Sequence, residues 1–141
     1  MSGVRLDTSA SLRDKSLQPT SDPLQDNGVT PRLVHAVRQG LDSAWENWSL
    51  SPDWRKKAEE YCHNVKIVVS GGFNIEKITR FEKQAVPVDI YAVGSSFLDN
   101  HGVTVMDFTA DIVKVKIGGE WVHMAKVGRQ ANENPDLERV W

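Results

Sequence analysis

The chain has 141 residues, enough for one domain that buries about two-thirds of the surface its unfolded form exposes. Hydrophobic residues make up 40% and charged residues 26%, which are ordinary globular values and exclude a disordered chain. The net charge is −2, lysines and arginines form no tract, and no stretch reaches the ~20 apolar residues of a membrane span. We therefore expect a protein that binds a small molecule, with neither nucleic acid nor membrane as partner.

The opening residues lack the apolar run of a signal peptide, so we expect a cytoplasmic protein. Only one cysteine, Cys62, is present, which excludes an internal disulfide and leaves no zinc-ligand spacing. Because free cysteines are usually buried, we expect a core thiol at this position rather than a nucleophile.

The N-terminal region predicts a short strand, Val4 to Asp7, followed by a long polar loop from Ser9 to Gly28. Arg5 and Asp7 are separated by one residue, so both side chains would project from the same face of that strand. Together they can hold a polar ligand, or they can form a structural ion pair. The residues alone leave both interpretations open.

Two helix starts follow, each with a hydroxyl residue before a proline at the first helical position. Thr30-Pro31 begins a helix with one apolar face, and Ser51-Pro52 begins a charged helix of about residues 52–61 that ends near His63-Asn64. The apolar face of the first helix is formed by Leu33, Val34, Val37, Leu41, Ala44 and Trp45.

The middle of the chain predicts a strand, a helix and a second strand. Val65 to Ser70 is a β-branched run typical of a strand covered on both faces in a parallel sheet. Asn74 can cap a helix over residues 75–84, and Val88 to Val93 forms the next strand, which completes a βαβ unit. On the helix we expect Ile75, Ile78, Phe81 and Ala85 to face the sheet. We expect Glu76, Lys77, Arg80 and Lys83 to face water.

The last part of the chain changes from this pattern to alternating apolar and polar residues, with a turn at Gly118-Gly119. This predicts an antiparallel hairpin as an appendix to an α/β domain. The expected strands cover residues 104–108, 110–117 and 120–126. We accordingly expect an α/β domain over residues 1–100 and a β hairpin with its tail over residues 101–141.

Both strands of the βαβ unit end in small residues, at the edge where parallel α/β folds bind ligands. These turns can offer backbone N–H groups and hydroxyls to an anion, next to the positive end of the following helix. Such glycines can also serve only to allow tight turns. Two successive strands with the same ending favour a phosphate site, whose candidate residues are Gly71, Gly72, Gly94, Ser95 and Ser96.

Five motifs, taken in order, resemble the C-terminal part of nicotinate phosphoribosyltransferases and span nearly the whole chain. They are residues 3–8 (GVRLDT), 68–72 (VVSGG), 88–96 (VDIYAVGSS), 107–113 (DFTADIV), and 126–129 (KVGR) continuing through 134–140 (NPDLERV). The resemblance implies an α/β fold, namely part of a type II phosphoribosyltransferase barrel, which is similar to a TIM barrel, with a C-terminal antiparallel β appendix.

The resemblance also implies a reaction: nicotinate and phosphoribosyl pyrophosphate give nicotinate mononucleotide and pyrophosphate, with assistance from ATP, in NAD salvage. No tightly bound cofactor is implied, and no resident metal site, although Mg and ATP take part in the family's reaction. Such an enzyme binds phosphates and stabilises an oxocarbenium-like ribose in the transition state. Carried over by motif, Arg5 would contact the pyridine ring and its carboxylate, and Asp7 would bind ribose hydroxyls or stabilise charge as the catalytic residue.

The family's chains are longer, so the resemblance implies that this chain is a fragment, or that a separate chain supplies the remaining barrel strands. Full-length members are expected to be homodimers. The phosphorylated histidine of the family has no counterpart here, and we expect His35, His63, His101 and His123 to be surface or packing residues. A non-catalytic remnant that binds phosphate or a nucleotide, and a related quinolinate or nicotinamide phosphoribosyltransferase, remain alternatives.

Overall fold

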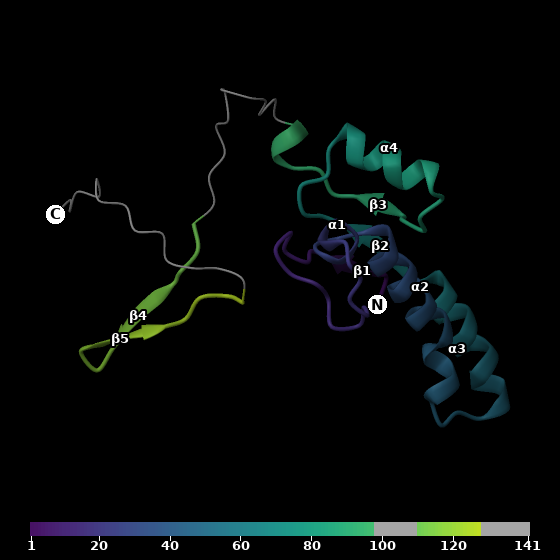
Figure 1. Cartoon of the computed structure of the whole chain (residues 1–141). Helices are drawn as coiled ribbons and strands as arrows, with labels where there is room; N and C mark the ends of the chain where they lie inside the picture. Colours follow the sequence, from purple (N-terminus) through teal and green to yellow (C-terminus); the bar gives the residue numbers. More distant parts are fainter. Residues whose placement is uncertain (98–109, 128–141) are drawn as a thin grey trace. The chain divides into compact units, whose positions relative to one another are not determined.

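The structure is a computed structural model that describes residues 1–97 and 110–127. The chain divides into two compact units, residues 1–106 and 107–141. The expected mixed α/β class is confirmed, because the first unit combines helices with a small parallel sheet and the second contains an antiparallel strand pair (Figure 1). The predicted boundary at residue 100, the strand at 104–108 and the tail lie outside the described residues.

The sheet of the first unit has three parallel strands in the order β1-β2-β3. Strand β1 spans Gly3–Leu6, β2 spans Lys66–Val69 and β3 spans Ile90–Tyr91. β1 and β2 lie so close at their start that a side chain at Gly3 would meet the carbonyl oxygen of Lys66 at 2.9 Å. The three predicted parallel strands are therefore present and pair as one sheet.

Strand β3 is shorter than the six residues expected, and Asp89 gives the physical reason. Its carboxylate accepts the backbone N–H of Ile67 at 2.8 Å and the Lys66 ammonium at 2.8 Å. The Asp89 side chain thus accepts the Ile67 N–H, which would donate to a main-chain carbonyl if β3 were longer. Beyond the strand, the Ala92 N–H still donates to the Val69 carbonyl at 2.8 Å, which keeps the chain beside β2.

The helices begin where the sequence predicts. In α2, Pro31–Ser43, the Thr30 hydroxyl accepts the Leu33 N–H, and in α4, Ile75–Lys83, the Asn74 side chain accepts the Lys77 N–H. Among the described residues, no helix combines the length and apolar character needed to cross a bilayer. The remaining helical elements of the first unit are α1 at Pro23–Asp26, η1 at Ala44–Asn47, α3 at Pro52–Asn64 and η2 at Ser95–Phe97.

The hydrophobic core lies on one face of the sheet, between β2 and the helices α2 and α4. Ile67 and Val69 point into it from β2, and Phe73 meets Phe81 edge-on with ring centroids 5.0 Å apart. The expectation that both faces of β2 are covered holds only in part for the other face, where the described residues leave Val68 half-buried and the adjacent Ile90 53% exposed. Cys62 is buried, as expected of a core thiol.

Three expectations for α4 require correction. Ile75 is 83% exposed, because it is the first residue of the helix and projects away from the sheet. Ala85 is exposed and has a left-handed φ of +48°, since the chain turns there to end the helix. Lys77 is half-buried and does not simply face water, because its ammonium lies 4.1 Å from the centre of the Phe73 ring.

The placement of α4 yields a stability prediction. Replacing Phe81, which is 0% exposed, by alanine should destabilise the protein by about 3–5 kcal/mol, because the substitution leaves a cavity in the core. The matched change Ile75→Ala should alter stability by less than about 0.5 kcal/mol. Urea denaturation of both variants measures the difference, and comparable losses would place Ile75 in the core after all.

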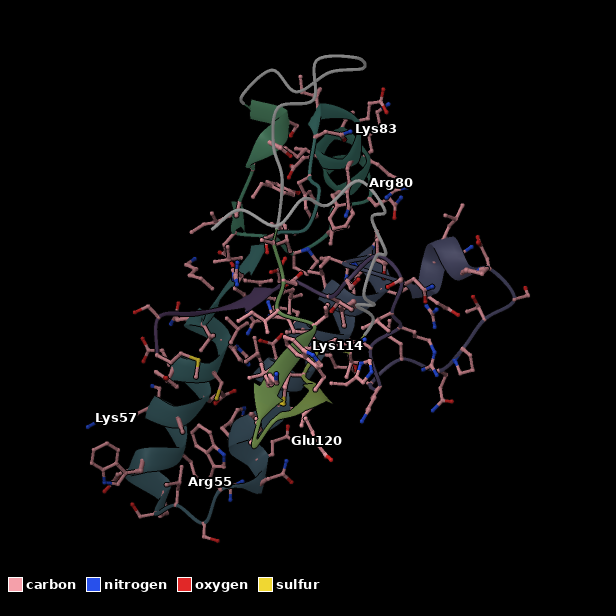
Figure 2. The ribbon with its side chains drawn as sticks, turned by 90° about the vertical axis from the view of Figure 1, so that its left-hand side faces the viewer. Arg55, Lys57, Arg80, Lys83, Lys114 and Glu120 are labelled. Carbon is pink, nitrogen blue, oxygen red and sulfur yellow. The ribbon has the colours of Figure 1, made fainter. Side chains whose placement is uncertain are left out.

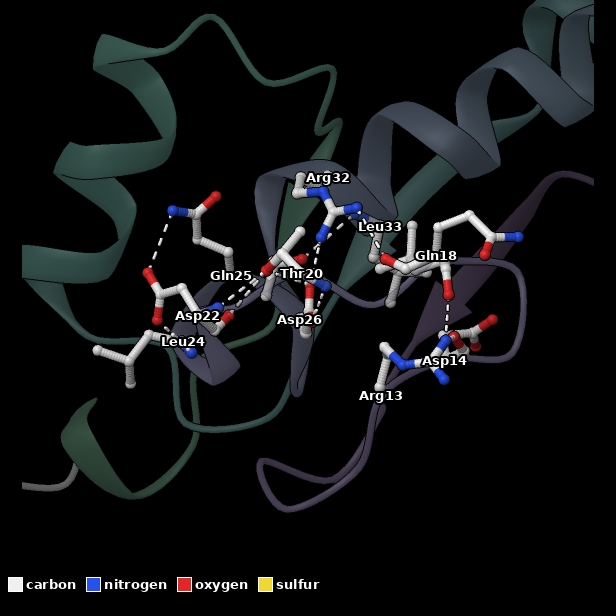
Figure 3. Close-up of polar contacts among 12 residues, drawn as sticks. Arg13, Asp14, Gln18, Thr20, Asp22, Leu24, Gln25, Asp26, Arg32 and Leu33 are labelled. Atoms are coloured by element: carbon white, nitrogen blue, oxygen red, sulfur yellow. Dashed lines mark hydrogen bonds and ion pairs between the residues drawn. The ribbon is translucent and has the colours of Figure 1, made fainter.

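The long loop after β1 is ordered by a buried acid. Asp26 lies at the end of α1, the short helix that the sequence did not predict. Its carboxylate accepts the Thr20 N–H at 2.6 Å and the Thr20 hydroxyl at 3.0 Å, and it forms an ion pair with Arg32 of α2 (Figure 3). Arg32 also donates to the Gln18 carbonyl at 3.0 Å. These contacts of Arg32 hold the loop after β1 against the first turn of α2.

The Asp26 network makes stability depend on pH. The backbone N–H of Thr20, its hydroxyl and Arg32 hold the pKa of Asp26 below its usual range. The contribution is therefore complete above the ordinary Asp pKa of about 3.9 and is lost as the pH falls through the lowered value. The variant Asp26→Asn should be less stable than the wild type near pH 7, with a gap that closes in acid. Urea denaturation across this range tests the effect, and a constant gap would contradict it.

The second unit contains the hairpin expected from the alternating pattern. Strand β4, Lys114–Ile117, pairs antiparallel with β5, Glu120–His123, around Gly118 and Gly119, which both have positive φ. Both strands are shorter than the predicted ranges, 110–117 and 120–126. The pair is held further by an ion pair between Lys126 and Asp111 at 3.1 Å.

Candidate functional site

A hollow of about 330 Å³ lies at the carboxyl ends of the three parallel strands. The loops that follow β2 and β3 form most of its wall, and β1 contributes one charged side chain. Four of the five predicted phosphate-binding residues and the predicted base-binding arginine therefore border a single cavity. Its lining residues are Arg5, Ser70, Gly71, Gly72, Phe73, Ala92, Val93, Gly94 and Ser95.

The turn after β2 depends on two glycines with left-handed backbone conformations. Gly71 has φ +90° and Gly72 has φ +69°, which side-chain-bearing residues rarely adopt. A side chain at Gly71 would also lie 3.5 Å from the Asp7 carboxylate. Within residues 1–97 and 110–127, no acceptor pairs with the backbone N–H groups of Gly71, Gly72, Gly94 or Ser95. Both loops therefore keep donors available for an anion.

Arg5 and Asp7 stand at the end of β1, as the alternation of strand side chains predicts. The Arg5 guanidinium and the Asp7 carboxylate are 3.5 Å apart, and their side chains are 63% and 49% exposed. The other oxygen of Asp7 accepts the Ser70 hydroxyl at 2.8 Å. Asp7 is thus oriented by its neighbouring strand, while Arg5 remains largely in water and free to meet a ligand.

The loops after β2 and β3 are joined through Ser96. Its hydroxyl donates to the Phe73 carbonyl at 2.7 Å, and its side chain does not border the hollow. We predicted Ser96 as a phosphate ligand, but the structure places its hydroxyl on a backbone carbonyl of the neighbouring loop. Its observed contact is structural, because it holds the two loops beside each other.

A second hollow, of about 350 Å³, shares Gly72 with the first and extends along the start of α4. Asn74, Glu76, Lys77 and Arg80 complete its lining. Burial, and to a smaller extent the nearby Arg80 charge, lowers the pKa of the Lys77 ammonium. Figure 2 shows Arg80 and Lys83 on α4, and of the positive side chains of this helix Lys77 and Arg80 line the hollow beside Gly72.

Sequence reasoning missed four residues at the site. Ser70 connects β1 to β2 through Asp7, and Phe73 anchors the turn in the core. The strand-ending motif that identified Gly71 contains Ser70 as well, so its hydroxyl could have been included. Ala92 and Val93 likewise lie in the 88–96 motif that identified Gly94, whereas the position of Phe73 depends on how the turn packs into the core.

The other candidate side chains do not gather into a site. Among the described residues, no group of three or more His, Cys, Asp or Glu side chains could hold a metal ion. His35, His63 and His123 are exposed, which confirms the expectation for these three, and His101 lies outside the described residues.

Comparisons of the chain with family models, with characterised proteins and with solved structures find no match. The likeness to nicotinate phosphoribosyltransferases therefore stays a prediction from sequence motifs.

The exposed ion pair yields a prediction that separates ligand binding from a structural role. Arg5→Ala should change the free energy of unfolding by less than about 1 kcal/mol, since ion pairs between exposed side chains contribute little. Asp89→Ala, which removes the acceptor of the Ile67 N–H, should cost about 1–3 kcal/mol. Urea denaturation measures both, and a larger loss for Arg5 would make its pair with Asp7 structural.

Proposed function

We propose that the chain carries the phosphate-binding end of a phosphoribosyltransferase barrel that joins nicotinate to the ribose of phosphoribosyl pyrophosphate. The observation that carries this proposal is the convergence of Arg5, the Gly71-Gly72 turn and the Gly94-Ser95 turn on one hollow. The substrate class comes from the resemblance of the motifs to nicotinate phosphoribosyltransferases. The shared hollow supports an anion-binding site, and the motifs supply the identity of the substrates.

The two glycine-containing turns would cradle the 5′-phosphate of the nucleotide. The backbone N–H groups of Gly71, Gly72, Gly94 and Ser95 are free of acceptors in the described part of the chain. Oriented N–H groups at the start of a helix favour an anion, and α4 begins three residues after Gly72. Because backbone N–H groups do not titrate, the two turns would add no pH dependence beyond that of the phosphate itself.

Arg5 would contact the pyridine ring and its carboxylate, for which a planar guanidinium with several donors is suited. Asp7 would bind ribose hydroxyls or stabilise the positive charge that develops at the anomeric carbon. The Ser70 hydroxyl donates to one oxygen of Asp7, which keeps the carboxylate oriented. Because this reaction requires charge stabilisation and little proton transfer, an oriented carboxylate suffices for the catalytic role.

Mg would enter with the phosphates of the substrate, since this ion is usually held by one or two carboxylates together with phosphate oxygens. Asp7 provides one such carboxylate beside Gly71, so the residues fit a substrate-borne ion. ATP would act as an assisting substrate. The three parallel strands would be part of a larger barrel, completed by strands of a longer chain or of a separate chain, with a homodimer as the expected assembly.

Titration calorimetry with nicotinate mononucleotide tests the binding site directly, with nicotinate riboside, which differs from it only in lacking the phosphate, as the matched ligand. We expect the riboside to bind much more weakly than the phosphorylated compound, because it cannot use the backbone donors of the two turns. An assay with nicotinate, phosphoribosyl pyrophosphate, ATP and Mg tests turnover. Binding without turnover would favour a phosphate-binding remnant over an enzyme, and absence of binding would overturn the proposed site.

Gly94→Val should abolish binding of nicotinate mononucleotide while leaving the fold intact. A side chain at Gly94 would meet no atom within 4 Å, so the added methyl groups have room and would fill the hollow where the phosphate approaches. Gly40→Val is the matched control, because Gly40 lies on α2 away from the hollow and is equally unobstructed. Calorimetry and thermal denaturation of both variants give the answer. Unchanged affinity in Gly94→Val would remove that turn from the site.

A further inference from the structure

We propose that Lys77 is a positioning residue that sets the direction in which the Gly71-Gly72 turn presents its backbone donor to phosphate. The proposal rests on the phosphate site described above, and it adds a residue of α4 that does not border the 330 Å³ hollow. Lys77 would act on the ligand only through the turn. Its role is therefore distinct from that of the residues that line the site.

The Lys77 ammonium is held by two contacts on the turn itself. It donates to the Gly71 carbonyl at 3.2 Å, and it lies 4.1 Å from the centre of the Phe73 ring. Phe73 is buried in the core, and the Lys77 backbone is fixed because its N–H donates to the Asn74 side chain. Both the ring and the start of the lysine side chain are therefore held in place. The lowered pKa of Lys77, caused mainly by burial, agrees with a partly desolvated ammonium that does not extend into water.

The contact matters because the Gly71 carbonyl and the Gly72 N–H belong to the same peptide unit. A trans peptide is planar, and its C=O and N–H point in opposite directions. When Lys77 holds the carbonyl on the side of α4, the N–H of Gly72 is directed to the opposite side. Two consecutive glycines would otherwise let this peptide rotate at low cost, since both can adopt positive and negative φ.

The far end of the turn is held in a similar manner. The Phe73 carbonyl accepts the Ser96 hydroxyl at 2.7 Å, which ties the turn to the loop after β3. Ser96 thus restrains the peptide after Phe73, and Lys77 restrains the peptide between the glycines. Of these two restraints, only the one from Lys77 acts on a peptide whose N–H belongs to a residue lining the hollow.

The first experiment compares three variants of the whole chain by calorimetry with nicotinate mononucleotide and with inorganic phosphate. Lys77→Met should weaken binding about tenfold, the effect of one hydrogen bond from a charged donor. Lys77→Arg should restore most of the affinity, because a guanidinium can donate to the same carbonyl. Lys83→Met, which removes an exposed charge from the last turn of α4, should leave affinity unchanged (Figure 2).

The second experiment needs no ligand and therefore separates this proposal from the proposed function. The backbone amide signals of Gly71 and Gly72 are followed by NMR relaxation dispersion in the free protein. Lys77→Met should introduce microsecond-to-millisecond exchange at these two amides, whereas Lys83→Met and Lys77→Arg should not. Thermal denaturation of each variant verifies that the fold is retained.

The outcomes are distinguishable. If the wild type binds no phosphate compound but Lys77→Met introduces exchange at the Gly71 and Gly72 amides, the proposed function fails and the positioning role stands. If Lys77→Met weakens binding while the glycine amides stay unchanged, Lys77 acts as a direct charge and the positioning role is overturned. Unchanged affinity together with unchanged amides overturns it as well.

Discussion

Parallel pairing of β1, β2 and β3 is the constraint on which the candidate site depends. Leu6 pairs with Val69, and Val69 pairs with Tyr91, so all three strands end at one edge of the sheet. Residues 5, 71 and 94 are far apart in sequence, and this register alone brings their loops to a common hollow. A shift of one residue would turn the Arg5 side chain to the opposite face and break the Ser70 contact with Asp7.

Side-chain hydrogen bonds keep the backbone of the hollow in place, and of the residues that form them only Ser70 lines the hollow. Ser70 and Asp7 connect the ends of β2 and β1, Ser96 connects the two loops, and Lys77 holds the carbonyl of Gly71. Glycines give the turn its left-handed conformation but cannot restrain it. A backbone phosphate site therefore needs such external hydrogen bonds, because a freely rotating peptide would lose conformational entropy each time it bound an anion.

Local signals sufficed for the elements whose determinants are close in sequence. Thr30 and Asn74 cap the helices that their neighbours predict, and the glycine pairs end β2 and close the hairpin. The shortness of β3 was not predictable, since it depends on a carboxylate that captures an N–H 22 residues away. The order of the loop after β1 likewise depends on the buried contacts of Asp26, and a polar sequence gives no sign of them.

The partly exposed face of the sheet, where Ile90 is 53% exposed, bears on how a ligand would lie. Arg5, Val68 and Ile90 are partners in adjacent strands, so their side chains share this face next to the hollow. Under the proposed function, the pyridine ring of nicotinate mononucleotide would lie over Val68 and Ile90, with its carboxylate near the Arg5 guanidinium. The phosphate of the nucleotide would then reach the glycine turns. Parallel strands are normally covered on both faces, and an aromatic ligand at this edge would cover part of the apolar surface that the first unit leaves exposed. Binding of nicotinate mononucleotide would then draw on both the apolar face and the backbone donors, which is why the riboside and inorganic phosphate separately report on the two halves of the site.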